Sequence, residues 1–185
     1  MAEIWFSSDL HLYHDKPFLF EPRGFSNREE HTEKLIENFN KVVRPGDTLY
    51  LLGDNWLTCS LEEGLEAFKR IKCDNIKLIW GNHDSPQRRA ALLELPNVEG
   101  LGYSDLIKIK KKFYLISHYI TLTANYDDTY HKAIRNLHGH THSKEKLTSP
   151  YTVNVSVDAW DNYPANFEEI EGLIRKDSLG GNYEK

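Results

Sequence analysis

The stretch Ile76-Lys77-Leu78-Ile79-Trp80-Gly81-Asn82-His83-Asp84 joins an apolar run to an abrupt polar ending. The apolar part predicts a short buried strand over residues 76–80. Ser85-Pro86 follows at once and predicts a helix start, because serine caps helices and proline suits the first helical position. The polar residues therefore lie where a strand gives way to a helix. In open α/β sheets, ligands bind just beyond such strand ends.

The same alternation occurs earlier in the chain. Residues 4–8 and 48–52 are apolar runs that predict buried strands, and a helical pattern follows each of them. Two sequences resemble capping boxes and predict the helix starts: Ser26-Asn27-Arg28-Glu29 and Ser60-Leu61-Glu62-Glu63. Strands that alternate with helices predict a parallel α/β sheet.

The second half is richer in strand patterns. Further strands are predicted over residues 103–109, 113–117, 136–139 and 152–157. Asn166 predicts the cap of a last helix of about ten residues. Residues 9–25 are expected to form a long irregular segment, and loops of that length in compact domains are usually functional.

Length and composition set the class of protein. A chain of 185 residues with 39% hydrophobic residues has room for one domain, which we expect to span residues 1–176, with residues 177–185 as a flexible tail. No apolar run reaches the roughly 20 residues that cross a bilayer, and the N-terminus lacks the features of a signal peptide. Two cysteines do not indicate a disulfide framework. These observations predict a cytoplasmic protein without a membrane partner.

Five short polar segments follow the predicted strands and hold five of the nine histidines. They are Asp9-Leu10-His11, Gly53-Asp54-Asn55, Gly81-Asn82-His83-Asp84, Ser117-His118 and Gly139-His140-Thr141-His142. By composition, about 0.6 Asp-x-His pairs, about 0.03 Gly-His-x-His and about 0.002 Gly-Asn-His-Asp are expected, so the last two patterns are the informative ones. Oxygen and imidazole donors without thiolate suit Zn, Fe or Mn rather than a cysteine-rich structural zinc site.

Spacing within two of these segments is informative. Side chains at positions i and i+2 of an extended chain point the same way. Asp9 and His11 can therefore share one ligand, and so can His140 and His142.

In this order, the five segments resemble the motifs of the calcineurin-like metallophosphoesterases, over residues 9–142. Residues 153–170 are also similar to the ending of small bacterial and phage-type members. The resemblance implies an α/β fold, a four-layer α/β/β/α sandwich of two mixed sheets with the helices outside. One departure is Asn55-Trp56-Leu57, where many members carry an acidic residue shortly after Gly-Asp. It leaves the shape of this loop open.

The resemblance implies two divalent metal ions as cofactors, either Mn, Fe, Zn or Ni. It assigns one ion to Asp9, His11, Asp54 and His142, and the other to Asp54, Asn82, His118 and His140. Asp54 bridges the two ions, and a hydroxide shared between them is the expected nucleophile. His83 is the expected general acid, and Asp84 is expected to orient it or raise its pKa.

Three residues are candidates for substrate contact. His14 is more simply a solvated loop histidine, with a substrate-facing role as the alternative. Arg23 lies between Pro22 and Gly24, where a phosphate contact and an ordinary loop ion pair are equally expected. Asn55, in the segment Gly53-Asp54-Asn55, is the third candidate.

Other polar residues have simpler interpretations. His138 is expected to be a structural strand residue, and His31 to be exposed on a helix among glutamates. Asp158 either forms a hydrogen bond with a ligating histidine or belongs to a turn.

Together these features predict a metal-dependent phosphohydrolase, most simply a phosphodiesterase that acts on a small phosphoester. A nuclease is the first alternative, but a net charge of −5 and only one lysine-rich stretch, residues 108–112, do not favour nucleic acid as a partner. The second alternative is a protein-binding scaffold of the same fold, as in the retromer complex. Such relatives often lose the histidine that corresponds to His83, which this chain keeps. The oligomeric state is left open.

Overall fold

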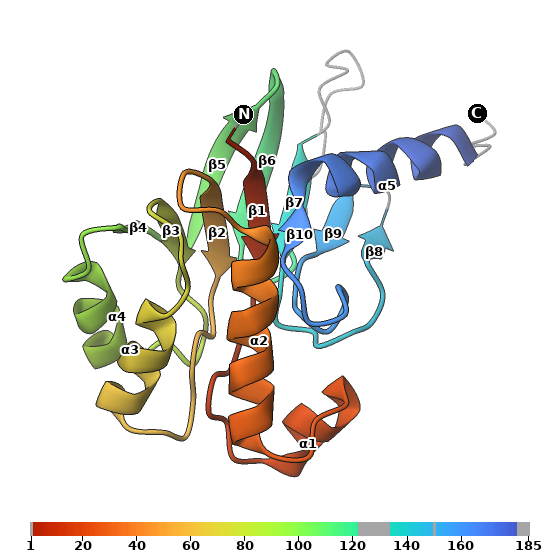
Figure 1. Ribbon diagram of the computed structural model, residues 1–185. Coiled ribbons are helices and arrows are strands. Elements are labelled where there is room, and N and C mark those ends of the chain that lie inside the picture. The colour runs from red at the N-terminus through yellow and green to blue at the C-terminus, as the bar shows by residue number, and fades with distance from the viewer. Residues whose placement is uncertain (1, 122–133, 150, 181–185) are drawn as a thin grey trace.

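The computed structural model describes residues 2–121, 134–149 and 151–180, with side chains up to residue 174. Two five-stranded sheets lie at its centre (Figure 1). The first has the order β10-β1-β2-β3-β4 and the second β5-β6-β7-β9-β8, and both mix parallel with antiparallel pairs. The expected pair of mixed sheets with flanking helices is confirmed.

The strands of the first sheet are β1 (Ile4–Ser7), β2 (Thr48–Leu52), β3 (Ile76–Ile79), β4 (Val98–Gly102) and β10 (Ala165–Asn166). Those of the second are β5 (Ser104–Ile109), β6 (Lys112–Ser117), β7 (Arg135–His138), β8 (Leu147–Ser149) and β9 (Thr152–Asn154). The strands β1 to β4 are parallel, and so are β6, β7 and β9. The loops that follow these parallel strands therefore lie together at the carboxyl ends of each sheet.

Successive residues of the first sheet serve two different cores. Trp5 packs with α2 (Arg28–Val42), α3 (Leu61–Lys69) and α4 (Pro86–Leu93) on the outer side. Phe6, the next residue, packs between the sheets with residues such as Tyr114. This follows from the period of two in a strand, and burial of both faces is why the sequences of these strands are continuous apolar runs. The helix α5 (Phe167–Gly180) contributes Phe167, Ile170 and Ile174 to the same core as Phe6.

The helix starts agree with the sequence at three of four positions. At one of them Asn166 caps α5, because its Oδ1 accepts a hydrogen bond from the Glu168 N–H at 2.9 Å. Ser60 and Glu63 form the predicted capping box of α3, and Ser85 caps α4 with Pro86 in its first turn. For α2 the predicted box is wrong by one residue. Asn27 is the cap, because its side chain accepts a hydrogen bond from the Glu30 backbone at 2.8 Å.

The segment expected to be irregular over residues 9–25 contains two short helices. These are α1 (Pro17–Phe20) and the 3₁₀-helix η1 (Glu21–Arg23). Both prolines stand in a first turn, where the missing backbone N–H costs nothing, so they begin these helices and do not interrupt them.

Several boundaries differ from the sequence expectation. The strands β4, β8 and β10 were not predicted, and only residues 152–154 of the expected strand 152–157 form β9. The last helix continues to Gly180, into the expected tail, while residues 181–185 lie outside the described residues. Within the described part of the chain, no helix combines the length and apolar character that a membrane span needs.

Candidate metal centre

The predicted polar segments meet at the carboxyl ends of strands from both sheets. Asp9 and Asp54 follow β1 and β2, Asn82 follows β3, and His118 and His140 follow β6 and β7. Backbone hydrogen bonds tie these loops together. The Asp9 N–H donates to the Gly53 carbonyl and the His11 N–H to the Asp54 carbonyl, both at 3.0 Å.

One carboxylate oxygen of Asp9 accepts hydrogen bonds, and the other has no hydrogen-bond partner. Its Oδ2 accepts hydrogen bonds from Ser8 Oγ at 2.6 Å and from the His140 N–H at 2.9 Å. Its Oδ1 is buried without a hydrogen-bond partner and lies 3.6 Å from His142 Nε2 and 4.0 Å from His11 Nε2. Both ring nitrogens of His11 are also buried and unpartnered. Buried polar atoms of this kind are costly unless a ligand satisfies them.

Asp54 stands between histidines that come from different sheets. Its Oδ1 accepts a hydrogen bond from the His83 N–H at 2.9 Å. Its Oδ2 lies 3.6 Å from His11 Nε2 and 3.4 Å from His118 Nε2. Burial raises the pKa of the Asp54 carboxyl, although the nearby His118 acts in the opposite direction. One carboxylate oxygen thus faces the ring nitrogens of both histidines.

Two of the imidazoles are oriented through their second nitrogen. His118 Nδ1 lies 2.8 Å from the Leu52 carbonyl oxygen, which can only accept, so Nδ1 carries the proton of the neutral ring. Its Nε2 is then left with a free lone pair, and the Asn82 Oδ1 acceptor lies 2.9 Å away. His142 Nδ1 lies 3.0 Å from Asp158 Oδ2. Burial acts to lower the pKa of His142, but the hydrogen bond to Asp158 and the charge of Asp9 raise it overall. Carboxylates and carbonyls orient metal-binding histidines in this way.

These donors fit divalent metal ions. Single ligand atoms of Asp9, His11 and His142 lie within 4.8 Å of one another, and so do those of Asp9, Asp54 and His118. His140 joins the second group from the side, since its ring lies 5.1 Å from that of His118. The set contains oxygens and imidazole nitrogens only, which suits Zn, Fe, Mn or Ni.

The spacing allows His140 and His142 to share one ligand, but the structure separates them. His142 lies against Asp9 and His11, whereas His140 lies against His118. The reasoning assumed an extended chain, but the backbone is left-handed at both residues, with φ of 67° and 48°. Asp9 and His11 do converge as expected, although they too are left-handed.

The left-handed backbone is concentrated at the predicted ligands. Asp9, His11, Asp54, His140 and His142 have φ values between 46° and 67°. Residues other than glycine rarely adopt this conformation, and strain of this kind clusters at functional sites.

Two motif glycines make room for carboxylates that come from other motifs. A Cβ atom on Gly81 would lie 2.1 Å from Asp54 Oδ1, and one on Gly139 would lie 2.3 Å from Asp9 Oδ2. The glycines of Gly-Asn-His-Asp and Gly-His-x-His are thus required by close approach. This relationship is invisible within either motif.

The comparisons with known proteins agree with this geometry. The family model described as calcineurin-like phosphoesterase matches residues 2–175. The chain belongs to the calcineurin-like phosphoesterases.

Relatives of this phosphoesterase cover almost its whole length. It is 30% identical to the uncharacterized protein MJ1445 of Methanocaldococcus jannaschii, over 95% of this chain and 93% of the relative. It is 26% identical to the gene 66 protein of Mycobacterium phage D29, over 94% and 96%. Its structure is similar to that of AQ665 from Aquifex aeolicus, a protein of unknown function. The TM-score is 0.71 at 26% identity, over 94% and 100% of the two chains.

The two residues expected to act in proton transfer have different environments in this phosphoesterase. The His83 side chain is exposed, and its ring centre lies 5.6 Å from that of His11. Asp84 is buried, and its carboxylate accepts hydrogen bonds from the N–H groups of Gly81 at 2.8 Å and Asp54 at 3.0 Å. The expectation that Asp84 orients His83 is therefore wrong, because its oxygens are used to join the loops after β2 and β3.

All three residues predicted to contact substrate are buried. Asn55 is completely buried beneath the loops, with its Nδ2 donating to Asp84 Oδ1 at 3.4 Å. This position does not support a substrate contact. His14 is only 6% exposed, so the expectation of a solvated loop histidine is wrong. It packs against His11, with ring centres 5.3 Å apart, and burial lowers its pKa.

Arg23 forms the ion pair and not the phosphate contact. Its Nε donates to Asp158 Oδ1 at 2.9 Å and its Nη2 to Asp158 Oδ2 at 2.7 Å. The same guanidinium also donates to the carbonyls of Asp9 at 2.9 Å and Leu10 at 3.3 Å. Burial acts to raise the pKa of Asp158, but the hydrogen bonds from His142 and Arg23 lower it to about 2. Asp158 therefore connects a predicted ligand to a buried arginine.

Of the remaining histidines, one expectation is confirmed and one is wrong. His138 is buried in β7 and structural, with Nε2 2.9 Å from Thr148 Oγ1. His31 was expected to be exposed but is completely buried, with Nε2 2.9 Å from Arg23 Nη1. Burial, reinforced by the Arg23 charge, lowers the pKa of His31 to about 3. The helix face that carries it packs on the loop after β1, which the flanking glutamates did not reveal.

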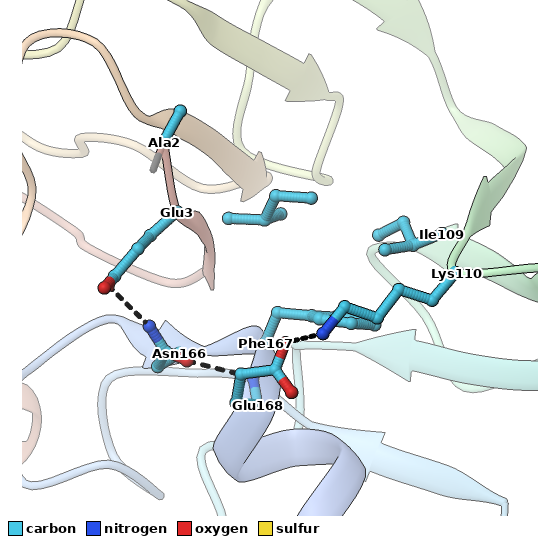
Figure 2. Close-up of a pocket in the computed structure, with 8 residues that line it drawn as sticks. Ala2, Glu3, Ile109, Lys110, Asn166, Phe167 and Glu168 are labelled. Carbon is cyan, nitrogen blue, oxygen red and sulfur yellow. Dashed lines mark hydrogen bonds and ion pairs between the residues drawn. The ribbon is translucent and has the colours of Figure 1, made fainter.

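A cavity of about 480 Å³ lies at the other end of β1 and holds none of the predicted site residues. Figure 2 shows its polar side chains paired with one another, Lys110 with Glu168 and Asn166 with Glu3. The predicted ligands of this phosphoesterase lie beyond the opposite end of the same strand.

Proposed function

We propose that the protein is a phosphodiesterase that depends on two divalent metal ions, either Mn, Fe, Zn or Ni. The observation that carries this proposal is the position of Asp54 Oδ2, 3.6 Å from His11 Nε2 and 3.4 Å from His118 Nε2. A carboxylate oxygen that faces two presented imidazole nitrogens is suited to link two cations. The unpartnered Asp9 Oδ1 and His11 nitrogens support the same interpretation.

The proposed ligands divide into two sets that share Asp54. The first set is Asp9, His11, Asp54 and His142, and the second is Asp54, Asn82, His118 and His140. When bound, a pair of ions like this activates water as a nucleophile and offsets charge on the phosphoryl oxygens. Hydrogen bonds hold four of these side chains in place, those of Asp9, Asp54, His118 and His142. The chain therefore presents these donors in a fixed arrangement.

His83 is the proposed proton donor to the leaving oxygen. Its backbone is held on both sides, since its N–H donates to Asp54 Oδ1 at 2.9 Å and its carbonyl accepts from Arg88 Nη1 at 2.6 Å. Its imidazole is left exposed beside His11. A protonated ring there can donate to the ester oxygen as the P–O bond breaks, and the departing group leaves as an alcohol.

The outer face of the site is open among the described residues. Four of its residues are exposed to solvent: Asn82, His83, His140 and His142. An open face admits a phosphorus that carries two ester groups, which favours a diester over a monoester. A small phosphoester is therefore the proposed substrate.

The test compares hydrolysis of bis-p-nitrophenyl phosphate and p-nitrophenyl phosphate by metal-stripped protein to which each metal is restored. We expect diester cleavage with at least one metal, two ions bound per chain, and a loss of about 10²–10⁴-fold in kcat for His83→Ala. Leu93→Ala is the matched control, since Leu93 is exposed on α4, the helix that follows His83. Two bound ions without cleavage of either ester under any metal would instead favour a protein-binding scaffold.

A further inference from the structure

Two exposed aromatic side chains, Phe18 and Tyr119, lie near the proposed metal ligands. Phe18 is 72% exposed and Tyr119 is 49% exposed. Scattered exposed apolar residues are ordinary, so exposure alone carries little weight. What distinguishes these two is their connection to the proposed ligands, which Tyr119 touches directly and Phe18 reaches through His14. Each is also held by buried or hydrogen-bonded neighbours.

Phe18 projects from a small helix anchored by its other side chains. In α1, Leu19 and Phe20 are buried, whereas Phe18 points outward. Its ring packs edge-on against His14 with centres 5.7 Å apart, and His14 lies 5.3 Å from His11. In Figure 1, α1 lies at the end of the molecule toward which β1 and β2 point.

Tyr119 directly follows the predicted ligand His118. Its ring lies 4.7 Å from that of His140 and 5.1 Å from that of His118, edge-on to both. Its backbone carbonyl accepts hydrogen bonds from Ser117 Oγ at 2.8 Å and Thr121 Oγ1 at 3.4 Å. The ring is therefore supported beside the second set of proposed ligands.

The two rings reach the proposed ligands through different histidines. Phe18 reaches the site through His14 and His11, and Tyr119 through His118. His11 and His118 both face the same oxygen of Asp54. An exposed aromatic ring is thus connected to each of the two proposed ligand sets that share Asp54.

We propose that the substrate is a dinucleotide-sized phosphodiester with a nucleobase on each side of the phosphorus, stacked on Phe18 and on Tyr119. This inference rests on the proposed phosphodiesterase function. Aromatic rings bind bases of any sequence through their faces. The net charge of −5 and the scarcity of basic stretches disfavour a long polyanion, so two rings and two bases are the favoured match. In the reaction a water oxygen binds phosphorus, the P–O bond to one nucleoside breaks, and that oxygen takes up a proton. The products are a nucleoside and a nucleoside monophosphate.

The test compares three substrates of the metal-loaded protein: adenylyl-adenosine, glycerophosphocholine as an aliphatic diester, and a ten-residue oligoadenylate. We expect kcat/KM to be highest for the dinucleotide. Phe18→Ala and Tyr119→Ala should each raise its KM about tenfold with little change in kcat. Tyr119→Phe should restore binding, and calorimetric affinity for adenosine monophosphate should fall in Tyr119→Ala or in Phe18→Ala.

Tyr151→Ala is the control, because Tyr151 is also exposed but precedes β9, at the end of that strand away from the site. Equal cleavage of the aliphatic diester, or alanine variants that leave the dinucleotide KM unchanged, would overturn the inference while leaving a phosphodiesterase. A strong preference for the oligonucleotide would overturn it in favour of a nuclease. Loss of all cleavage, including that of bis-p-nitrophenyl phosphate, would instead count against the proposed function itself.

Discussion

Arg23 and Asp158, which are 135 residues apart in the chain, form a two-pronged ion pair beneath the metal centre. The nitrogen–oxygen distances are 2.9 and 2.7 Å, and the two side chains are only 1% and 10% exposed. The pair joins the helical segment after β1 to the turn after β9, and through His142 Nδ1 it reaches the metal site.

Arg23→Met should be strongly destabilising, because it leaves the Asp158 carboxylate buried without its main partner. The free energy of unfolding in urea should fall by roughly 3–5 kcal/mol. Arg70→Met is the matched control. Its ion pair with Glu33 is equally close, but both side chains are about half exposed, so the loss should stay below about 1 kcal/mol. Similar losses in both variants would contradict the buried role of Arg23.

Gly81→Ala and Gly139→Ala should weaken metal binding, because each new Cβ would overlap a carboxylate oxygen of Asp54 or Asp9. We expect the dissociation constant for Mn²⁺ to rise about tenfold or more, as measured by calorimetry. Gly172→Ala in α5 adds the same atom where no other atom lies within 4 Å, and should leave the affinity unchanged. Unchanged affinity in the first two variants would show that the loops move apart at little cost.

Asp84→Asn should lower both stability and metal affinity. Its Oδ2 accepts from the backbone N–H groups of Gly81 and Asp54, and its Oδ1 faces the N–H and the Nδ2 of Asn55 at 3.4 Å. Donors thus face both oxygens, so an amide NH₂ in place of either oxygen sets donor against donor. The expected loss is about 1–3 kcal/mol in the free energy of unfolding. His83→Gln alters an exposed side chain and should change neither quantity. If Asp84→Asn kept full stability and only shifted the pH profile of kcat, Asp84 would act on His83 after all.

His31 should make the protein less stable as the pH falls below about 6.5. Its pKa is about 3 in the folded protein, against 6.5 for an ordinary histidine, so the unfolded chain binds a proton that the folded chain does not. At pH 5 this amounts to about 2 kcal/mol relative to pH 8. His31→Gln still offers Arg23 an acceptor and cannot be protonated, so its loss of stability between pH 8 and 5 should be smaller by about that amount. Parallel curves for the two proteins would mean that His31 is not buried as a neutral ring.

The sequence was most informative where a strand ended in a rare motif. The strands before Asp9, Asp54 and Asn82 were predicted from apolar runs, and parallel strands necessarily bring their carboxyl ends together. The strands that were missed are short or contain glycine. Val98–Gly102 has two glycines and no buried residue, so it lacks the apolar run that marked the other strands of this sheet.

The residues that support the site were harder to predict, because their roles depend on contacts across the fold. Asp84 and His83 are neighbours in sequence, yet one is buried and the other exposed. Arg23 and His31 meet each other only because η1 folds back toward α2. Ser8 donates a hydrogen bond to Asp9 Oδ2, but a serine at the end of a strand carries no signal of its own, so this role cannot be predicted from the sequence.

The left-handed backbone at Asp9, His11, Asp54, His140 and His142 places stability and chemistry in opposition. Glycine would adopt this backbone conformation with the least strain at each of these positions, but each substitution would remove a proposed metal ligand. Selection of variants for higher thermal stability alone would therefore favour substitutions that abolish metal binding. Selection that also demands metal binding is needed to hold the chain in this shape.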